Sequence, residues 1–345
     1  FNGQGIFELR NEGNVVVIEW FDRPGGRLLG EVYVHDVAEQ QLRGRISFFW
    51  DGQSTPLTWL DTIGTGLEDY SPVITHQASA SGSSTAGNDV VYLNDVGVTA
   101  YDLLGGNDIF AVGTVPTNGV TVNGGAGNDI FFIADGPVTL NGGADRDTVV
   151  FARALATPQG DDSMLIDPTE LTLGGVRIDL SLTGAQTTPY DTVTLAGIEN
   201  VVGTAGNDTL IGNASDNVLS GDDGDDSLSG GEGDDSLFGW GGDDTLTGGD
   251  GADQFVIAMD DGGQRDVITD FDPLTDTLVF SFAEGSFPQG DEPDLEDFLD
   301  RITVTELGLL LDGSADGQAS VLLEGIYDLE DLTTQNIRLA YYSTE

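Results

Sequence analysis

A repeat of nine residues constrains the fold of this chain more than any other feature. From Gly203 to Val256 the sequence divides, without insertion, into GTAGNDTLI, GNASDNVLS, GDDGDDSLS, GGEGDDSLF, GWGGDDTLT and GGDGADQFV. The blocks follow the pattern G-G-x-G-x-D-x-U-x, in which U is apolar. Position 8 is Leu or Phe in every block, and position 6 is Asp or Asn. A flexible Gly/Asp-rich linker has no need for this phase, so the pattern indicates a repetitive fold.

Each block predicts a turn followed by a short strand. Glycine in the first half supplies backbone angles that residues with a Cβ resist, and the position 6 residue ends the turn. Positions 7 to 9 then extend, with the side chain of position 8 buried. Two blocks make one coil, and successive coils stack about 4.8 Å apart through parallel ladder bonds. The sequence therefore predicts an all-β protein built on a right-handed parallel β-roll or β-helix.

The stacking also predicts calcium sites. Turn n lies beside turn n+2, so two position 6 side chains converge with several backbone carbonyls. Such an all-oxygen site suits Ca²⁺, which takes about 6–8 oxygen ligands, whereas Zn²⁺ prefers His and Cys. The turn GNASDN has Asn at position 6 and is expected to give the weakest site. The candidate metal ligands in the repeats are Gly203, Asp208, Asn217, Gly221, Asp226, Gly230, Gly233, Asp235, Gly239, Gly242, Asp244, Gly248, Gly251 and Asp253.

A looser form of the repeat lies upstream. The segments AGNDVVY, GGNDIFA, AGNDIFF and ADRDTVV place the candidate ligands Asp89, Asp108, Asp129 and Asp147 about one coil apart. Short strands without an acidic turn, such as GVTVN, lie between them. The stretch is predicted to be the same coil with calcium turns mainly on one edge. Counting n/n+2 pairs in both stretches gives about seven Ca²⁺ ions.

The remainder is predicted to be β structure in further domains. Residues 1–83 form an N-terminal antiparallel unit with strands in GIFELR, NVVVIEWF, GEVYVHDV and RGRISFFW, followed by a connector. Residues 84–150 are the upstream roll, 151–202 an intervening β segment and 203–256 the regular roll. Residues 257–345 are a β-rich cap and secretion region, with one short helix expected in PDLEDFLDRI.

Composition excludes several classes of partner and of site. The chain has 60 acidic and 11 basic residues, for a formal net charge of -49, and no cysteine. This balance argues against nucleic acid and anionic membranes, whose phosphates need cationic partners. No apolar run is long enough for a transmembrane segment. With only His35 and His76, and neither an HExxH nor a GxSxG motif, we predict no catalytic residue.

The regular block resembles the calcium-binding repeats of RTX (repeats-in-toxin) proteins. The approach GIENVVGTAGNDTLIGN and the exit DVITDFDPLTDTLVF resemble sequences that flank those repeats. The resemblance implies that the position 6 side chains and the carbonyls of the first four positions bind Ca²⁺. It also implies an uncleaved C-terminal signal for the type I secretion machinery. The implied location is extracellular, or on the cell surface of a Gram-negative bacterium.

Together these observations predict a secreted, non-enzymatic calcium-binding protein with a structural or adhesive role in a surface layer, filament or matrix. Its partners would be calcium ions, the type I secretion machinery, and either further copies of itself or a surface polysaccharide. The alternative is that the chain is the C-terminal accessory and secretion portion of a larger RTX exoenzyme. The catalytic domain of that hydrolase, lyase or protease would lie upstream of Phe1.

Overall fold

The fold is taken from a computed structural model of the whole chain. The structure describes residues 6–12, 15–21, 28–35, 84, 86–87, 90–93, 98–112, 118–133, 136–151, 153–159, 163–170, 174–189, 191–258, 264–283, 302–312, 320–328, 332 and 336–342. All regular structure in these residues is β, with no helix among them. The expected helix in PDLEDFLDRI lies almost entirely outside them. None of the described segments is a helix long and apolar enough to cross a membrane.

The N-terminal unit is a three-stranded antiparallel sheet, described here by itself. Its strands are β1 (Ile6–Glu12), β2 (Val15–Phe21) and β3 (Leu28–His35), paired in that order. Val15 pairs with both Glu12 and His35, as in a meander. The fourth predicted strand, RGRISFFW, lies outside the described residues.

One long parallel sheet runs through the rest of the described chain. Its ten strands all pair in parallel, each with the next strand of the sheet along the chain. The strands, in chain order, are β4 (Val90–Leu93), β6 (Ile109–Val112), β8 (Ile130–Phe132), β10 (Thr148–Val150), β16 (Asn200–Val202), β18 (Val218–Asp223), β20 (Ser236–Gly241), β22 (Gln254–Ala258), β24 (Thr277–Ala283) and β28 (Ile337–Tyr342).

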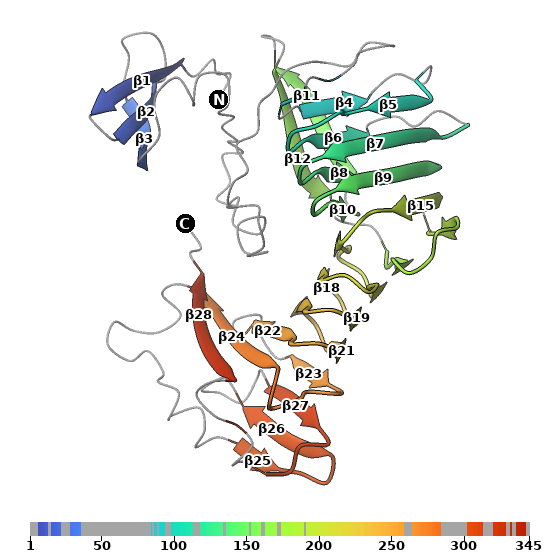
Figure 1. Cartoon of the computed structure of the whole chain (residues 1–345). Helices are drawn as coiled ribbons and strands as arrows, with labels where there is room; N and C mark the ends of the chain where they lie inside the picture. The colour runs from blue at the N-terminus through green and yellow to red at the C-terminus, as the bar shows by residue number, and fades with distance from the viewer. Residues whose placement is uncertain are drawn as a thin grey trace. The chain divides into compact units, whose positions relative to one another are not determined.

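The opposite face of the roll consists of two separate sheets. The first has five strands: β5 (Ala100–Asp102), β7 (Val120–Ala126), β9 (Val138–Ala144), β15 (Thr192–Ala196) and β14 (Gln186–Thr187). The second has eight strands: β13 (Arg177–Asp179), β17 (Thr209–Ile211), β19 (Ser227–Glu232), β21 (Thr245–Asp250), β23 (Arg265–Ile268), β27 (Ser320–Glu324), β26 (Gly308–Asp312) and β25 (Ile302–Val304). Figure 1 shows these strands stacked across from the ten-stranded sheet.

The position 8 side chains fill the interior between the two faces. Leu210 pairs with Leu228, and Leu219 with Leu237, so each block is in register with the block two further on. These four side chains are all buried. Because every strand repeats the same register, the apolar residues form one continuous core. The predicted parallel β-roll is confirmed.

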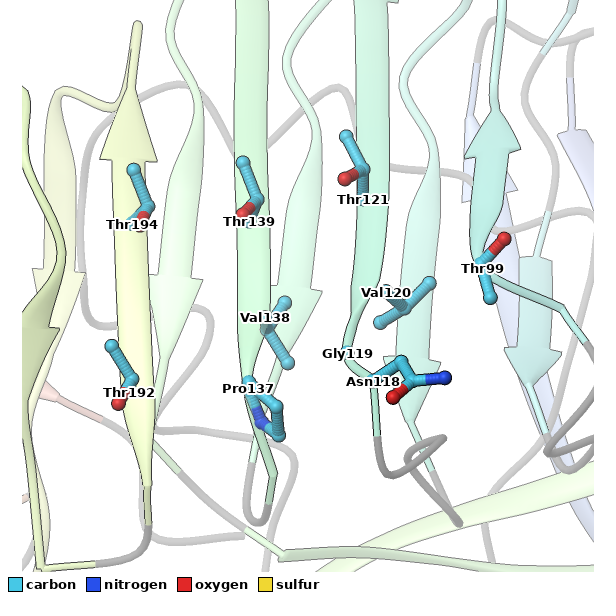
Figure 2. Close-up of a pocket in the computed structure, with 10 residues that line it drawn as sticks. All are labelled: Thr99, Asn118, Gly119, Val120, Thr121, Pro137, Val138, Thr139, Thr192 and Thr194. Atoms are coloured by element: carbon cyan, nitrogen blue, oxygen red, sulfur yellow. The ribbon is translucent and has the colours of Figure 1, made fainter.

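The outward faces of the upstream strands are polar. In β7 the residues alternate between buried Val120 and Val122 and exposed Thr121. Thr121, Thr139 and Thr194 are in register on three neighbouring strands, and Figure 2 shows their side chains along the shallow hollow over the five-stranded sheet. The period of two places the core on one side and hydroxyl groups on the other.

Residues 151–199 interrupt only one face of the roll. They contain the antiparallel hairpin β11 (Arg153–Gln159) and β12 (Ser163–Glu170), then β13 and β14, which lie at the edges of the two smaller sheets. On the other face β10 pairs directly with β16, which pairs with β18. The ten-stranded sheet therefore crosses the boundaries near 150, 202 and 256 that the sequence analysis placed between domains.

The stacked core generates a prediction about stability. Leu237 is fully buried, whereas Leu274 is 92% exposed. Leu237→Ala leaves a cavity between two ladders and is expected to lower the free energy of unfolding by about 2–5 kcal/mol. Leu274→Ala is the matched control and should change it by less than about 0.5 kcal/mol. Urea unfolding at saturating Ca²⁺ measures both values. Equal losses would contradict the stacked core.

Candidate metal centre

The position 6 residues form two rows along the edges of the roll. We call the residues at the N-terminal ends of the strands of the ten-stranded sheet the ten-strand row, and those at the N-terminal ends of the strands of the eight-stranded sheet the eight-strand row. The ten-strand row is Asp108, Asp129, Asp147, Glu199, Asn217, Asp235, Asp253 and Asp276. The eight-strand row is Asp208, Asp226, Asp244 and Asp266. Asp89 lies outside the described residues.

Backbone hydrogen bonds tie each row together. The N–H of Asp226 donates to Asp244 Oδ1 at 2.8 Å, and the N–H of Asp235 donates to Asp253 Oδ1 at 2.9 Å. The same bond runs from Asp129 to Asp147 at 2.8 Å. Each carboxylate thus uses one oxygen to accept the amide of the preceding coil. This bond fixes the orientation of the second oxygen.

The second carboxylate oxygen is buried without a hydrogen bond in most of these residues. A buried polar atom without a partner is costly, so six in register need an explanation. The residues whose Oδ2 atoms have this property are Asp129, Asp147, Asp226, Asp235, Asp244 and Asp253. A cation bound at the turns would supply the missing partner for each.

The glycines at position 1 show where the oxygens converge. A methyl group added to Gly124 would collide with Asp129 Oδ2 of its own turn and with the carbonyl of Gly142 in the next coil. A methyl group on Gly230 would meet Asp235 Oδ2 and the Gly248 carbonyl in the same way. Side-chain and carbonyl oxygens from neighbouring coils therefore face one another at these two glycines. Only glycine leaves room for them.

The donor set fits Ca²⁺. The described residues contain no group of three or more His, Asp or Glu side chains arranged to hold a metal. A cation in the turns must therefore take most of its ligands from backbone carbonyls, as Ca²⁺ does more readily than Zn²⁺. The predicted glycines Gly203, Gly221, Gly239 and Gly248 each face the position 6 side chain of their own turn, as Gly230 does.

The position 4 glycines shape the turns rather than face the carboxylates. Gly233, Gly242 and Gly251 have φ values of 114°, 129° and 157°. A methyl group on Gly242 or Gly251 would strike the carbonyl of the position 4 glycine in the preceding coil. These residues are therefore required both by the left-handed backbone and by close coil stacking.

Burial raises the pKa of the row carboxylates. The pKa of Asp226 is raised to about 9 by burial and by the neighbouring charges of Asp208 and Asp244. For the same reasons the pKa of Asp147 is raised to about 8 and that of Asp235 to about 7. No described Arg lies within ion-pair distance of these groups; the ion pair between Arg146 and Asp216 is partly exposed. A divalent cation would supply the absent positive charge.

Sequence reasoning missed three members of the rows. Glu199 Oε2 accepts the N–H of Asp147 at 2.9 Å, Asp266 Oδ1 that of Asp244 at 3.1 Å, and Asp276 Oδ1 that of Asp253 at 3.0 Å. Asp266 and Asp276 lie 22 and 23 residues after their partners, outside the phase of nine. The segments DVIT and DTLV keep the D-x-U-x pattern, and this signal identifies them.

A second, outer row was also missed. Asp225 Oδ1 accepts the N–H of Asp243 at 3.0 Å, and Asp243 Oδ1 accepts that of Arg265 at 2.9 Å. These position 5 bonds run in the opposite direction along the stack from the position 6 bonds. The two sets together hold each turn against both of its neighbours.

Comparison with known proteins agrees with this geometry. Residues 194–228 and 220–255 match the family described as RTX calcium-binding nonapeptide repeat (4 copies), which confirms the resemblance to RTX repeats. No curated protein matches the chain. Among solved structures, the extracellular lipase LipA from Serratia marcescens is 19% identical, with a TM-score of 0.28. The match covers 78% of this chain and 42% of the lipase chain.

The raised pKa values predict opposite effects of pH with and without calcium. An unfolded Asp titrates near 3.8, and folding raises the pKa of Asp226 to about 9. The ionised form therefore disfavours the fold, with no penalty below pH 4 and the full penalty above about pH 9. In EDTA the β signal in far-UV circular dichroism, which is lost at pH 8, should return in part as the pH falls to 5. The affinity for Ca²⁺ should fall over the same range, because protons compete for the ligands.

The control for this prediction is Asp226→Asn, which removes the group with the highest of these pKa values. Its β signal in EDTA should vary less between pH 8 and pH 5 than that of the parent. A β signal in EDTA that falls on acidification from pH 8 to 5 would contradict the burial of ionisable carboxylates.

Proposed function

We propose that this RTX repeat protein, whose residues 194–255 are calcium-binding nonapeptide repeats, folds its β-roll on Ca²⁺ and serves outside the cell as a structural or adhesive element. The observation that carries the proposal is the set of six buried, unpartnered Asp oxygens in two rows. These carboxylates repel one another in the folded chain without a cation. Calcium binding and folding are then one process.

The ligands in this proposal are the position 6 carboxylates of the rows and the carbonyls that face them. Asp129, Asp147, Asp235 and Asp253 act on one edge, and Asp226 and Asp244 on the other. Asp108 has the same place in the ten-strand row, where its N–H donates to Asp129 Oδ1 at 2.8 Å. About seven Ca²⁺ ions result, one for each of these Asp residues.

Calcium-dependent folding also suits export. In a cytosol with little free calcium the chain remains expanded by its net charge of -49 and can thread through a type I secretion channel. Outside the cell, calcium at about tenfold its dissociation constant contributes about 1.4 kcal/mol for each site. Seven such sites sum to about 10 kcal/mol, comparable to the stability of a whole domain. The roll then becomes a rigid rod-like scaffold built from repeated coils.

For the structural or adhesive role, we expect the calcium-loaded chain to bind either copies of itself or a surface polysaccharide. Sedimentation velocity with and without Ca²⁺ measures self-association, and retention on immobilised polysaccharide measures adhesion. A chain that stays monomeric and unretained at physiological calcium would remove this part of the proposal. It would leave calcium-dependent folding intact.

The proposal predicts that calcium removal unfolds the roll. EDTA should abolish most of the β signal in far-UV circular dichroism and increase the hydrodynamic radius, and added Ca²⁺ should reverse both. Mg²⁺ at the same concentration should restore little, because it requires octahedral geometry and retains its waters. A Gly230→Ala variant should need more Ca²⁺ to fold, since the methyl group displaces Asp235 Oδ2. A β signal unchanged by EDTA would sink the proposal.

A further inference from the structure

The position 6 turns fall into two backbone classes. In the first, which we call open, the residues at positions 2 and 4 both have positive φ. Turn 230–235 is an example, with Gly231 at 118° and Gly233 at 114°. The conformation holds even without glycine at position 2, since Asp222 is at 79° and Trp240 at 70°. The open turns are 103–108, 124–129, 142–147, 221–226, 230–235, 239–244 and 248–253.

The second class, which we call closed, contains the first two turns of the regular repeats. Turns 203–208 and 212–217 are fully described, and none of their residues has positive φ. The N–H of position 2 instead donates to the position 6 side chain of the same turn. The bond runs from Thr204 to Asp208 Oδ2 at 2.6 Å and from Asn213 to Asn217 Oδ1 at 2.7 Å. The equivalent bond from Asp272 to Asp276 Oδ2, at 2.8 Å, closes turn 271–276 at the far end.

Closure uses the oxygen that an open turn leaves free. Asp208 accepts the N–H of Thr204 on Oδ2, and the N–H of Val176 and the Thr204 hydroxyl on Oδ1. Both of its carboxylate oxygens therefore accept hydrogen bonds from protein donors. In the open turns the corresponding Oδ2 atoms of Asp226 and Asp244 have no hydrogen bond. The two classes differ in whether an anionic oxygen remains for a cation.

In turn 212–217 a donor group replaces the second carboxylate oxygen. Asn217 Nδ2 donates to the carbonyl of Glu199 at 2.7 Å, so an amide N–H binds the backbone oxygen of the neighbouring coil. In this position the N–H gives the Glu199 carbonyl a hydrogen-bond partner, whereas in an open turn a cation would bind the corresponding carbonyl. The amide therefore joins the two coils without an ion.

Other side chains extend this junction across the coil of Glu199. Buried Asn200 donates from Nδ2 to Thr148 Oγ1 at 3.1 Å, and its Oδ1 accepts the N–H of Val218 at 3.1 Å. Asn200 thus links β10 to β18 across β16. Outside, Arg146 reaches Asp216 at 3.0 Å. Hydrogen bonds and one ion pair hold together the part of the roll where one face is interrupted.

From this geometry we infer a calcium-free junction within the roll. Turns 203–208 and 212–217 supply no side-chain ligand to Ca²⁺. Hydrogen bonds through Asp208, Asn217 and Asn200 join two separate blocks of calcium-binding turns. The inference rests on the proposed calcium function. It differs from the expectation that Asp208 and Asn217 are ligands and that Asn217 marks a weak site. The blocks lie upstream, at 103–147, and downstream, at 221–253.

The test counts bound ions in the full chain by equilibrium dialysis against ⁴⁵Ca²⁺ at saturating calcium. Asp208→Asn should leave the number of ions unchanged. Its matched control on the same row, Asp244→Asn, should lower the number by at least one. Loss of an ion from Asp208→Asn while the roll remains folded would overturn the inference. A parent chain that binds no calcium would instead overturn the proposed function.

A second set of variants tests the conformation directly. Asn217→Asp alone should add no ion, because turn 212–217 stays closed and loses its amide donor. Adding Asn213→Gly and Ser215→Gly gives this turn the glycines of turn 230–235 and should add one ion. A gain from Asn217→Asp alone would overturn the inference, as would no gain from the folded triple variant. Circular dichroism at saturating calcium establishes folding in every case.

Discussion

The whole roll depends on the burial of carboxylates without a protein cation to balance them. Asp226 and Asp235 lie within the stacked turns, each with one oxygen bound to a backbone amide and the other without a partner. Burying an ionised group in this way costs several kcal/mol unless a counter-charge is present. In the proposed function, calcium supplies that charge and takes its other ligands from backbone carbonyls of the same turns. The stability of the coil stack is therefore tied to the ion rather than to the apolar core alone.

Backbone conformation and charge are coupled in each turn. Positive φ at positions 2 and 4 opens the turn, and the open turn leaves the position 6 oxygen free of internal donors. The closed turns have no residue with positive φ, and their position 2 N–H donates to the position 6 side chain. One nonapeptide pattern thus accommodates both a candidate metal turn and a hydrogen-bonded turn. At position 2 the closed turns have Thr204 and Asn213, whereas the open turn 230–235 has Gly231 there.

The ten-stranded sheet runs without a break along the described coils of the roll. It passes from the upstream coils through β10, β16 and β18 into the regular repeats, although residues 151–199 separate β10 from β16 in sequence. Beyond the repeats, β24 and β28 prolong it, while Asp266 and Asp276 prolong the two rows. The secretion and adhesion parts of the proposed function remain predictions.

The sequence by itself determined the repeat, the buried Leu at position 8, the n to n+2 stacking and the choice of an oxygen-binding ion. These follow from local spacing, since a period of nine residues specifies which side chains are buried and which turns are neighbours. It placed Asp129, Asp147, Asp226, Asp235, Asp244 and Asp253 in the rows where the structure finds them. Tertiary structure alone decided which residues Glu199, Asp266 and Asp276 pair with in those rows, because insertions place them outside the phase of nine with those partners. It also decided that Asp208 and Asn217 are satisfied by hydrogen bonds, because the repeat pattern covers both open and closed turns, which differ in backbone φ and in the position 2 hydrogen bond.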